Sequence, residues 1–158
     1  MKKTPLLITI KRTNSNDPDF ACLENELNKY LTNIFGVKQQ YYDRLNVINN
    51  SSTVVVAYLN DEAVGCACLR EFDAETIEVK RMFVPELYRG KGIGSRILVE
   101  LEKWARELGY KYVILETGTL LKEAKALYKK SGYQVIENWG EYVGIETSVC
   151  MKKPLENA

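Results

Sequence analysis

The sequence predicts an α/β domain with a mixed β-sheet of about seven strands, flanked by about four helices. In the first half of the chain the strand-like segments follow one another through short turns, and in the second half they alternate with helices. Tight turns join antiparallel strands, and helices join parallel ones, so the sheet should be mixed. A chain of 158 residues with 46% hydrophobic and 27% charged residues suits one globular domain, and we expect residues 1–158 to form it.

The expected elements are recognised by hydrophobic period and by their end signals. Strands rich in β-branched and aromatic residues are expected at 6–11, 53–59, 63–72, 75–84, 111–117, 133–136 and 147–153. Helices with apolar residues at helical spacing are expected at 17–36, 41–48, 93–108 and 122–130. Asp17 followed by Pro18 starts the first helix, and Gly109 ends the third. Asn60 to Glu62 should form a hairpin turn.

The net charge and the hydropathy of the chain argue against nucleic acid and membranes as partners. The formal net charge is +1, which gives no support to a general nucleic-acid-binding surface. The apolar runs are far shorter than the roughly 20 residues that cross a bilayer. The apolar run near the N-terminus stops at Lys11 without a small-residue cleavage site, so a first strand is favoured over a signal peptide. We expect a cytoplasmic protein with no membrane or nucleic-acid partner, and the sequence leaves a homodimer open.

The cysteine and histidine content restricts the chemistry. The chain has four cysteines and no histidine, so nucleophilic mechanisms that depend on histidine are excluded. Cys66 and Cys68 are two residues apart in an expected strand and should share one face of the sheet. We interpret them as structural thiols in a reducing compartment, and we expect no metal site.

A glycine-rich turn joins the strand at 75–84 to the helix at 93–108. It consists of Arg89, Gly90, Lys91, Gly92, Ile93, Gly94 and Ser95. Glycine tolerates positive φ and lets a ligand approach the backbone closely, and a helix N-terminus directs free N–H groups at an anion. The turn therefore predicts a phosphate site. It fits neither the dinucleotide pattern G-x-G-x-x-G nor the P-loop pattern.

Two motifs resemble the GNAT superfamily of N-acetyltransferases. The pattern Arg-x-x-Gly-x-Gly, met by Arg89, Gly92 and Gly94, resembles the pyrophosphate-binding motif of that family. Residues 115–133 resemble the other half of its acyl-CoA site, a strand followed by a helix that ends in Leu-Tyr-x-x-x-Gly-aromatic. The residues that meet this second pattern are Leu127, Tyr128, Gly132 and Tyr133. One departure is Leu121, at a place where many relatives carry Asn or Gln.

The resemblance implies the fold, the co-substrate acetyl-CoA and roles for several residues. The strands at 75–84 and 111–117 are expected to splay, with the pantetheine arm between them and backbone groups of Met82 and Val84 near the acetyl group. Met82 and Val84 could instead be ordinary strand residues. Arg89 and Lys91 could pair with phosphate directly, or be solvated while the backbone amides bind it.

Two side chains are catalytic candidates under this resemblance. Tyr128 is the family's usual proton donor to the departing thiolate, and the alternative is a tyrosine that only packs. Glu78 lies where several relatives place a base, and the alternative is an exposed strand glutamate.

The expected activity is transfer of an acetyl group from acetyl-CoA to a primary amine of a small molecule or peptide, directly in a ternary complex. A non-catalytic acyl-CoA sensor and transfer of another acyl group are the alternatives. The acids Glu71, Asp73 and Glu75, with Glu78, should draw a cationic amine to the reaction point. Acceptor specificity is expected to come from loops at 33–42 and 138–145.

Overall fold

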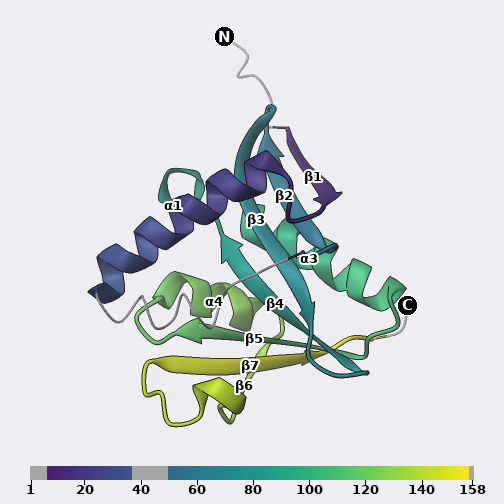
Figure 1. Cartoon of the computed structure of the whole chain (residues 1–158), viewed down its shortest axis with the longest axis vertical. Coiled ribbons are helices and arrows are strands. Elements are labelled where there is room, and N and C mark those ends of the chain that lie inside the picture. The colour runs from purple at the N-terminus through teal and green to yellow at the C-terminus, as the bar shows by residue number, and fades with distance from the viewer. Residues whose placement is uncertain (1–6, 37–49, 157–158) are drawn as a thin grey trace.

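A computed structural model of the chain describes residues 7–36 and 50–156, and it confirms the predicted mixed α/β architecture. Seven strands form one sheet in the order β1-β2-β3-β4-β5-β7-β6 (Figure 1). The strands are β1 (Ile8–Thr13), β2 (Val54–Leu59), β3 (Glu62–Glu71), β4 (Thr76–Phe83), β5 (Tyr112–Gly118), β6 (Gln134–Ile136) and β7 (Ser148–Pro154). The α-helices are α1 (Pro18–Phe35), α3 (Ile93–Glu107) and α4 (Lys122–Lys130). The described part of the chain also contains two short 3₁₀-helices, η2 (Glu86–Tyr88) and η3 (Gly140–Tyr142).

The end signals in the sequence act as predicted. The Asp17 side chain accepts a hydrogen bond from the Asp19 N–H at 2.9 Å, which caps α1, and Pro18 is its first helical residue. Asn60 and Asp61 both have positive φ, as a two-residue turn between β2 and β3 requires. The helix expected at 41–48 lies outside the described residues.

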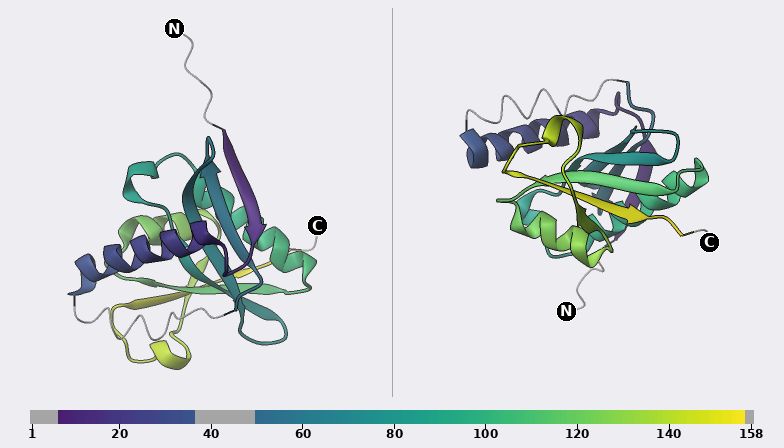
Figure 2. Two further views of the ribbon diagram at one scale, coloured as in Figure 1. Left: turned by 45° about the horizontal axis from the view of Figure 1, so that its top comes forward. Right: turned by 90° about the horizontal axis from the view of Figure 1, so that it is seen from below.

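Helices cover both faces of the sheet. On one face α1 packs through Phe20, Leu23 and Leu27 against a cluster that includes Cys66 and Cys68. On the other face α3 and α4 cover the larger core, with Ile97, Leu101 and Tyr128 among its buried residues. Figure 2 shows α1 and α4 on opposite sides of the sheet. Within residues 7–36 and 50–156, no helix combines the length and apolar character that a membrane crossing demands.

The sheet opens between β4 and β5. These two strands are parallel, and their pairing comprises only Thr76 with Tyr112 through Val79 with Leu115. Beyond this pair β4 continues to Phe83 and β5 to Gly118, while Figure 1 shows the two strands diverging. The splay expected from the family resemblance is therefore present, and it leaves an opening in the middle of the sheet.

Candidate active site

The glycine turn lies where β4 leads into α3, and two of its glycines are in the left-handed region. Gly90 has φ 80° and Gly92, the N-cap of α3, has φ 78°. A Cβ atom at either position would meet no other heavy atom within 4 Å, so the space beside this backbone is open. The N–H groups and positive dipole end of the 15-residue helix α3 lie directly after it. This geometry suits the approach of a phosphate.

Gly94 serves a different purpose from Gly90 and Gly92. A Cβ atom at Gly94 would lie 2.8 Å from Leu127 Cδ2 and 3.4 Å from Met82 Cε. Its hydrogen therefore lets α3 pack closely on α4 and on the side chain of Met82. Ile93 is buried in the core under the turn, whereas Lys91 is exposed and Ser95 half-buried.

The side chain of Arg89 is turned back onto the protein. Its Nε donates to the Val84 carbonyl at 2.8 Å, and its Nη1 lies 3.2 Å from a Glu123 carboxylate oxygen. The guanidinium also lies over the ring of Tyr30, 4.7 Å from the centroid. These contacts favour the alternative in which backbone amides, not the Arg89 cation, bind phosphate. One of these contacts also engages the carbonyl of Val84.

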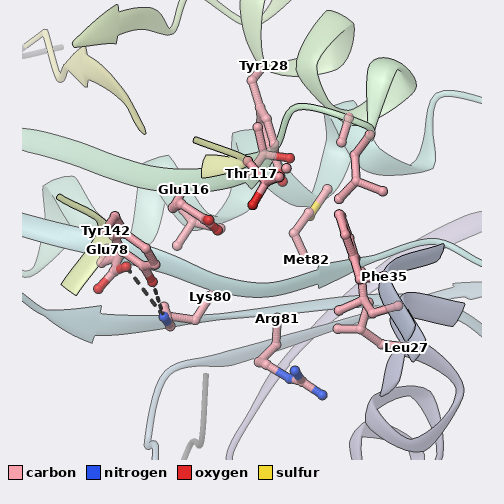
Figure 3. Close-up of a pocket in the computed structure, with 16 residues that line it drawn as sticks. Leu27, Phe35, Glu78, Lys80, Arg81, Met82, Glu116, Thr117, Tyr128 and Tyr142 are labelled. Carbon is pink, nitrogen blue, oxygen red and sulfur yellow. Dashed lines mark hydrogen bonds and ion pairs between the residues drawn. The ribbon is translucent and has the colours of Figure 1, made fainter. Parts of the chain in front are cut away.

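A cavity lies at the opening between β4 and β5 (Figure 3). Residues from both strands, from α1 and α4, and from the segment around η3 line it. They are Leu27, Leu31, Phe35, Glu78, Val79, Lys80, Arg81, Met82, Glu116, Thr117, Gly118, Leu121, Ala124, Tyr128, Tyr142 and Thr147. Phe35, the last residue of α1, and Tyr142 of η3 fall in the ranges 33–42 and 138–145 where we expected acceptor loops, of which residues 37–42 lie outside the described part of the chain. Leu121 adds an apolar wall at the start of α4.

A bulge in β4 reorients the backbone beside this cavity. Arg81 has φ 57°, and the register between β3 and β4 shifts between Cys66 and Cys68. The Cys68 thiol donates to the Lys80 carbonyl and the Cys66 thiol to the Arg81 carbonyl, both at 3.5 Å. Two successive carbonyls therefore point toward β3. Because the C=O and N–H of a trans peptide point in opposite directions, the N–H groups of Arg81 and Met82 are directed away from β3, toward the opening.

Glu78 is buried, not exposed as one of our alternatives had it. It is 1% exposed, and each of its carboxylate oxygens faces a cation. Oε1 lies 3.1 Å from Arg70 Nη2, and Oε2 lies 3.5 Å from Lys80 Nζ, an ion pair longer than a good hydrogen bond. Lys80 Nζ also donates to the Tyr142 hydroxyl at 3.0 Å. Burial lowers the pKa of Lys80, and the nearby charge of Glu78 acts in the opposite direction.

The structure adds Glu116, which the sequence reasoning missed. Glu116 follows Leu115, the last residue of β5 that pairs with β4; it lines the cavity and accepts a hydrogen bond from the Ser148 hydroxyl at 2.6 Å. Burial raises the pKa of Glu116, while the Ser148 hydrogen bond and the Lys80 charge act against that rise. The available signal was a single acid that ends the otherwise apolar run Val113 to Leu115.

Tyr128 lines the same cavity from α4. It is 5% exposed, and its ring packs edge-on against Tyr133 with 6.0 Å between centroids. Burial, and after it the charge of Glu116, raises the pKa of Tyr128, so its hydroxyl stays protonated well above neutral pH. Tyr133 has a structural partner of its own, since its hydroxyl donates to Glu102 at 3.1 Å.

The acidic turn before β4 does not line the cavity, so our expectation that all four acids lie beside the reaction point is wrong for Glu71, Asp73 and Glu75. Glu71 accepts a hydrogen bond from Tyr110, Glu75 pairs with Lys111, and Asp73 accepts from the N–H groups of its own turn. These local contacts hold the three acids at the far end of β4, and of the four acids only Glu78 lines the cavity.

Three of the four thiols lie in the core. Cys66, Cys68 and Cys150 are buried, and Cys22 is exposed on α1, outside the cavity lining. Burial raises the pKa of Cys66, raises that of Cys68 to about 12 and that of Cys150 to about 11. Among the described residues, no cluster of three or more His, Cys, Asp or Glu side chains could hold a metal ion.

Comparison with known proteins agrees with this geometry. Residues 20–133 match the model of the Acetyltransferase (GNAT) family. An IAA acetyltransferase from Azospirillum brasilense is 31% identical over 150 residues, which cover 94% of this chain and 98% of that protein. A Klebsiella pneumoniae structure described as a proposed acyl-CoA N-acyltransferase superposes with a TM-score of 0.76 at 27% identity, over 95% of this chain and 99% of the other.

A GNAT family acetyltransferase from Elizabethkingia anophelis, solved with acetyl-CoA bound, shares the fold with a TM-score of 0.65 at 23% identity. That likeness covers 94% of this chain and 98% of the other. The family, the fold and the enzyme class expected from the sequence are confirmed: this chain belongs to the GNAT family and is an N-acetyltransferase.

Proposed function

We propose that this enzyme transfers the acetyl group of acetyl-CoA to a primary amine of a small molecule or peptide. The observation that carries the proposal is the opening between β4 and β5. It brings Tyr128, the N–H groups of Arg81 and Met82, and the carboxylate of Glu116 to one cavity, beside the glycine turn. The four free cysteines favour a reducing compartment, so we place the reaction in the cytoplasm.

The residues present fit coenzyme A in charge and in shape. The open backbone at Gly90 and Gly92 and the N-terminal amides of α3 would bind the pyrophosphate. The stretch of β4 that no longer pairs with β5 offers backbone groups to the amide-bearing arm, in the manner of a strand edge that receives an extended ligand. Leu121 and Ala124 of α4 form an apolar wall where a hydrogen-bonding side chain would stand in many relatives.

Acetyl transfer needs a polarised carbonyl and a proton for the departing sulfur. The N–H groups of Arg81 and Met82 would stabilise the oxygen of the tetrahedral intermediate. Tyr128 would protonate the thiolate as the C–S bond breaks, since its raised pKa keeps a proton on it until then. The proton that the attacking nitrogen loses would restore the Tyr128 hydroxyl through water.

The amine must also lose a proton before it can attack. Our sequence-based candidate for this step is Glu78, but both of its oxygens face cations. Among the described residues Glu116 accepts a hydrogen bond from Ser148 and shows no such ion pair. We therefore favour Glu116 as the group that accepts the ammonium proton, with Glu78 holding Lys80 in place.

The transfer would be direct, in a ternary complex. A covalent acetyl-enzyme would require a nucleophile in the cavity, and the thiols of Cys66 and Cys68 face the α1 side of the core with raised pKa values. A protonated thiol is a poor nucleophile. The amine nitrogen would then attack the thioester itself.

The test is a screen of the purified protein with acetyl-CoA and a panel of primary amines, read by product mass and by free thiol. We expect at least one amine to gain one acetyl group for each thiol released. Binding of acetyl-CoA without thiol release across the panel would instead support the sensor, and faster turnover of a longer acyl-CoA would support another acyl group.

A further inference from the structure

Arg81 adopts a backbone conformation that its residue type disfavours. It is a non-glycine residue with φ 57° in the middle of a strand, and such residues persist only where their surroundings hold them. This conformation turns the Arg81–Met82 peptide so that its carbonyl faces β3, as the Lys80 carbonyl before it also does. Whatever holds Arg81 therefore also directs the two N–H groups at the cavity.

The side chain of Arg81 is hydrogen-bonded to α1. It is 5% exposed and runs from β4 toward that helix (Figure 3). Its Nε donates to Glu24 Oε2 at 2.9 Å, and its Nη2 donates to Asn28 Oδ1 at 2.5 Å and to the Glu24 carbonyl at 3.3 Å. Glu24 and Asn28 are one helical turn apart, so a single face of α1 supplies all three acceptors.

We propose that Arg81 is a positioning residue, and that its contacts with Glu24 and Asn28 hold the N–H groups of Arg81 and Met82 toward the acetyl carbonyl. The inference rests on the proposed function, because it presupposes that acetyl-CoA places its thioester at the opening. It adds a specific role for α1, a helix that contributes both these acceptors and the cavity residues Leu27, Leu31 and Phe35.

A purely structural role makes a different prediction. If Arg81 only attaches α1 to the sheet, its loss lowers stability and weakens coenzyme A and acetyl-CoA equally. If it directs the two N–H groups, its loss changes the hydrogen bonding of the thioester carbonyl, which coenzyme A lacks. The carbonyl stretching band of bound acetyl-CoA therefore separates the two roles, since hydrogen-bond donors shift that band to lower wavenumber.

The experiment uses acetyl-CoA labelled with ¹³C at the carbonyl, and isotope-edited infrared difference spectra of the bound form. The variants are Arg81→Met, Arg81→Gly and Asn28→Ala. We expect the band to move to higher wavenumber in Arg81→Met, and less so in Arg81→Gly because glycine adopts positive φ without strain. Asn28→Ala leaves residue 81 intact and should shift the band in the same direction by a smaller amount.

Arg12→Met is the matched control. Arg12 of β1 pairs with Glu100 and Glu107 of α3, so it also attaches a strand to a helix, but it lies outside the cavity lining. It should lower the melting temperature and leave the band unchanged. Affinity for coenzyme A should stay within about twofold of wild type in all variants, while affinity for acetyl-CoA falls in the Arg81 and Asn28 variants only.

An unchanged carbonyl band in Arg81→Met and Asn28→Ala, with acetyl-CoA bound, overturns the inference and leaves Arg81 as a structural contact. Should Arg81→Met fail to fold, Asn28→Ala alone decides between the two outcomes. A wild-type protein that does not bind acetyl-CoA at all is a different result, because it overturns the proposed function itself.

Discussion

Val79 of β4 and Leu115 of β5 form the last pair of the only parallel ladder in the described part of the sheet. The next residue on each strand, Lys80 or Glu116, lines the cavity and is no longer paired across this ladder, although β4 stays paired with β3 and β5 with β7. Two adjacent parallel strands that separate create a concave site at the carboxyl ends of the strands, with both backbones and the first side chains beyond the pair exposed to it. The proposed chemistry depends on this separation.

The first prediction concerns the glycine turn. Gly92→Ala should weaken acetyl-CoA binding, because a methyl group would project into the open space where a phosphate approaches the backbone. It should also cost about 1–2 kcal/mol of folding free energy, since alanine is strained at φ 78°. Isothermal titration and thermal melts measure the two effects.

Gly109→Ala is the matched control for that strain. Gly109 has φ 92° and equally open surroundings, but it lies at the other end of α3. We expect a similar loss of stability with unchanged affinity for acetyl-CoA. Equal affinities for Gly92→Ala and Gly109→Ala would argue against phosphate binding at the turn.

The second prediction concerns the proton acceptor. Glu116→Gln should slow acetylation at neutral pH by roughly 10²–10⁴-fold, the usual contribution of a positioned general base. The deficit should shrink at high pH, where more of the amine is already neutral. Glu78→Gln should lower the rate less, because its carboxylate is engaged by Arg70 and Lys80. If Glu78→Gln loses more of the acetylation rate at neutral pH than Glu116→Gln does, Glu78 is the proton acceptor instead.

The third prediction links the same residue to stability. Burial raises the pKa of Glu116 above its ordinary value, so the folded protein binds this proton more tightly than the unfolded chain. The contribution of Glu116 to stability is then fully present at acid pH and is lost as the pH rises through the folded-state pKa. Glu116→Gln should therefore melt higher than wild type at pH 8, with a gain that disappears below the pKa of a glutamate in an unfolded chain, about 4.3. A variant that melts lower at pH 8 would contradict the burial of a charged Glu116.

The fourth prediction concerns direct transfer. Protein incubated with acetyl-CoA alone should carry no acetyl group after denaturation, and initial rates with both substrates varied should give intersecting lines. Parallel lines, together with an acetylated cysteine in the mass spectrum, would indicate a covalent intermediate. Cys22→Ser should leave the kinetics unchanged, because Cys22 is exposed on α1 and lines no part of the cavity.

Local signals explain which parts of the fold could be predicted from the sequence. Hydrophobic period placed every described strand and α-helix, and the bounds of α4 were predicted to the residue. Gly90, Gly92 and Tyr128 could also be picked out from the sequence, because positive φ and a recurrent motif depend on neighbouring residues. These features need no knowledge of which strands lie side by side.

The remaining features arise from contacts between distant segments. Arg81, which has positive φ, is hydrogen-bonded through its side chain to Glu24 and Asn28, more than 50 positions earlier in the chain. The cavity position of Glu116 depends on where β5 leaves β4, and the acidic turn was misplaced because its distance from the opening depends on the same register. For Arg89 the sequence left direct pairing with phosphate and a solvated side chain as alternatives, and its contacts with Val84 and Glu123 are ones that chain order alone does not indicate.

The most direct test of the proposed transfer at this cavity is the rate of the chemical step in Tyr128→Phe, measured in a single turnover with the best amine of the panel. The ring and its packing remain, so the loss of one hydroxyl should slow this step by roughly 10²–10⁴-fold with little change in acetyl-CoA affinity. Tyr133→Phe removes the neighbouring hydroxyl, which is bound to Glu102, and should reduce stability but leave the step near the wild-type rate. A Tyr128→Phe protein that acetylates the amine as fast as wild type would contradict the role of Tyr128 as proton donor.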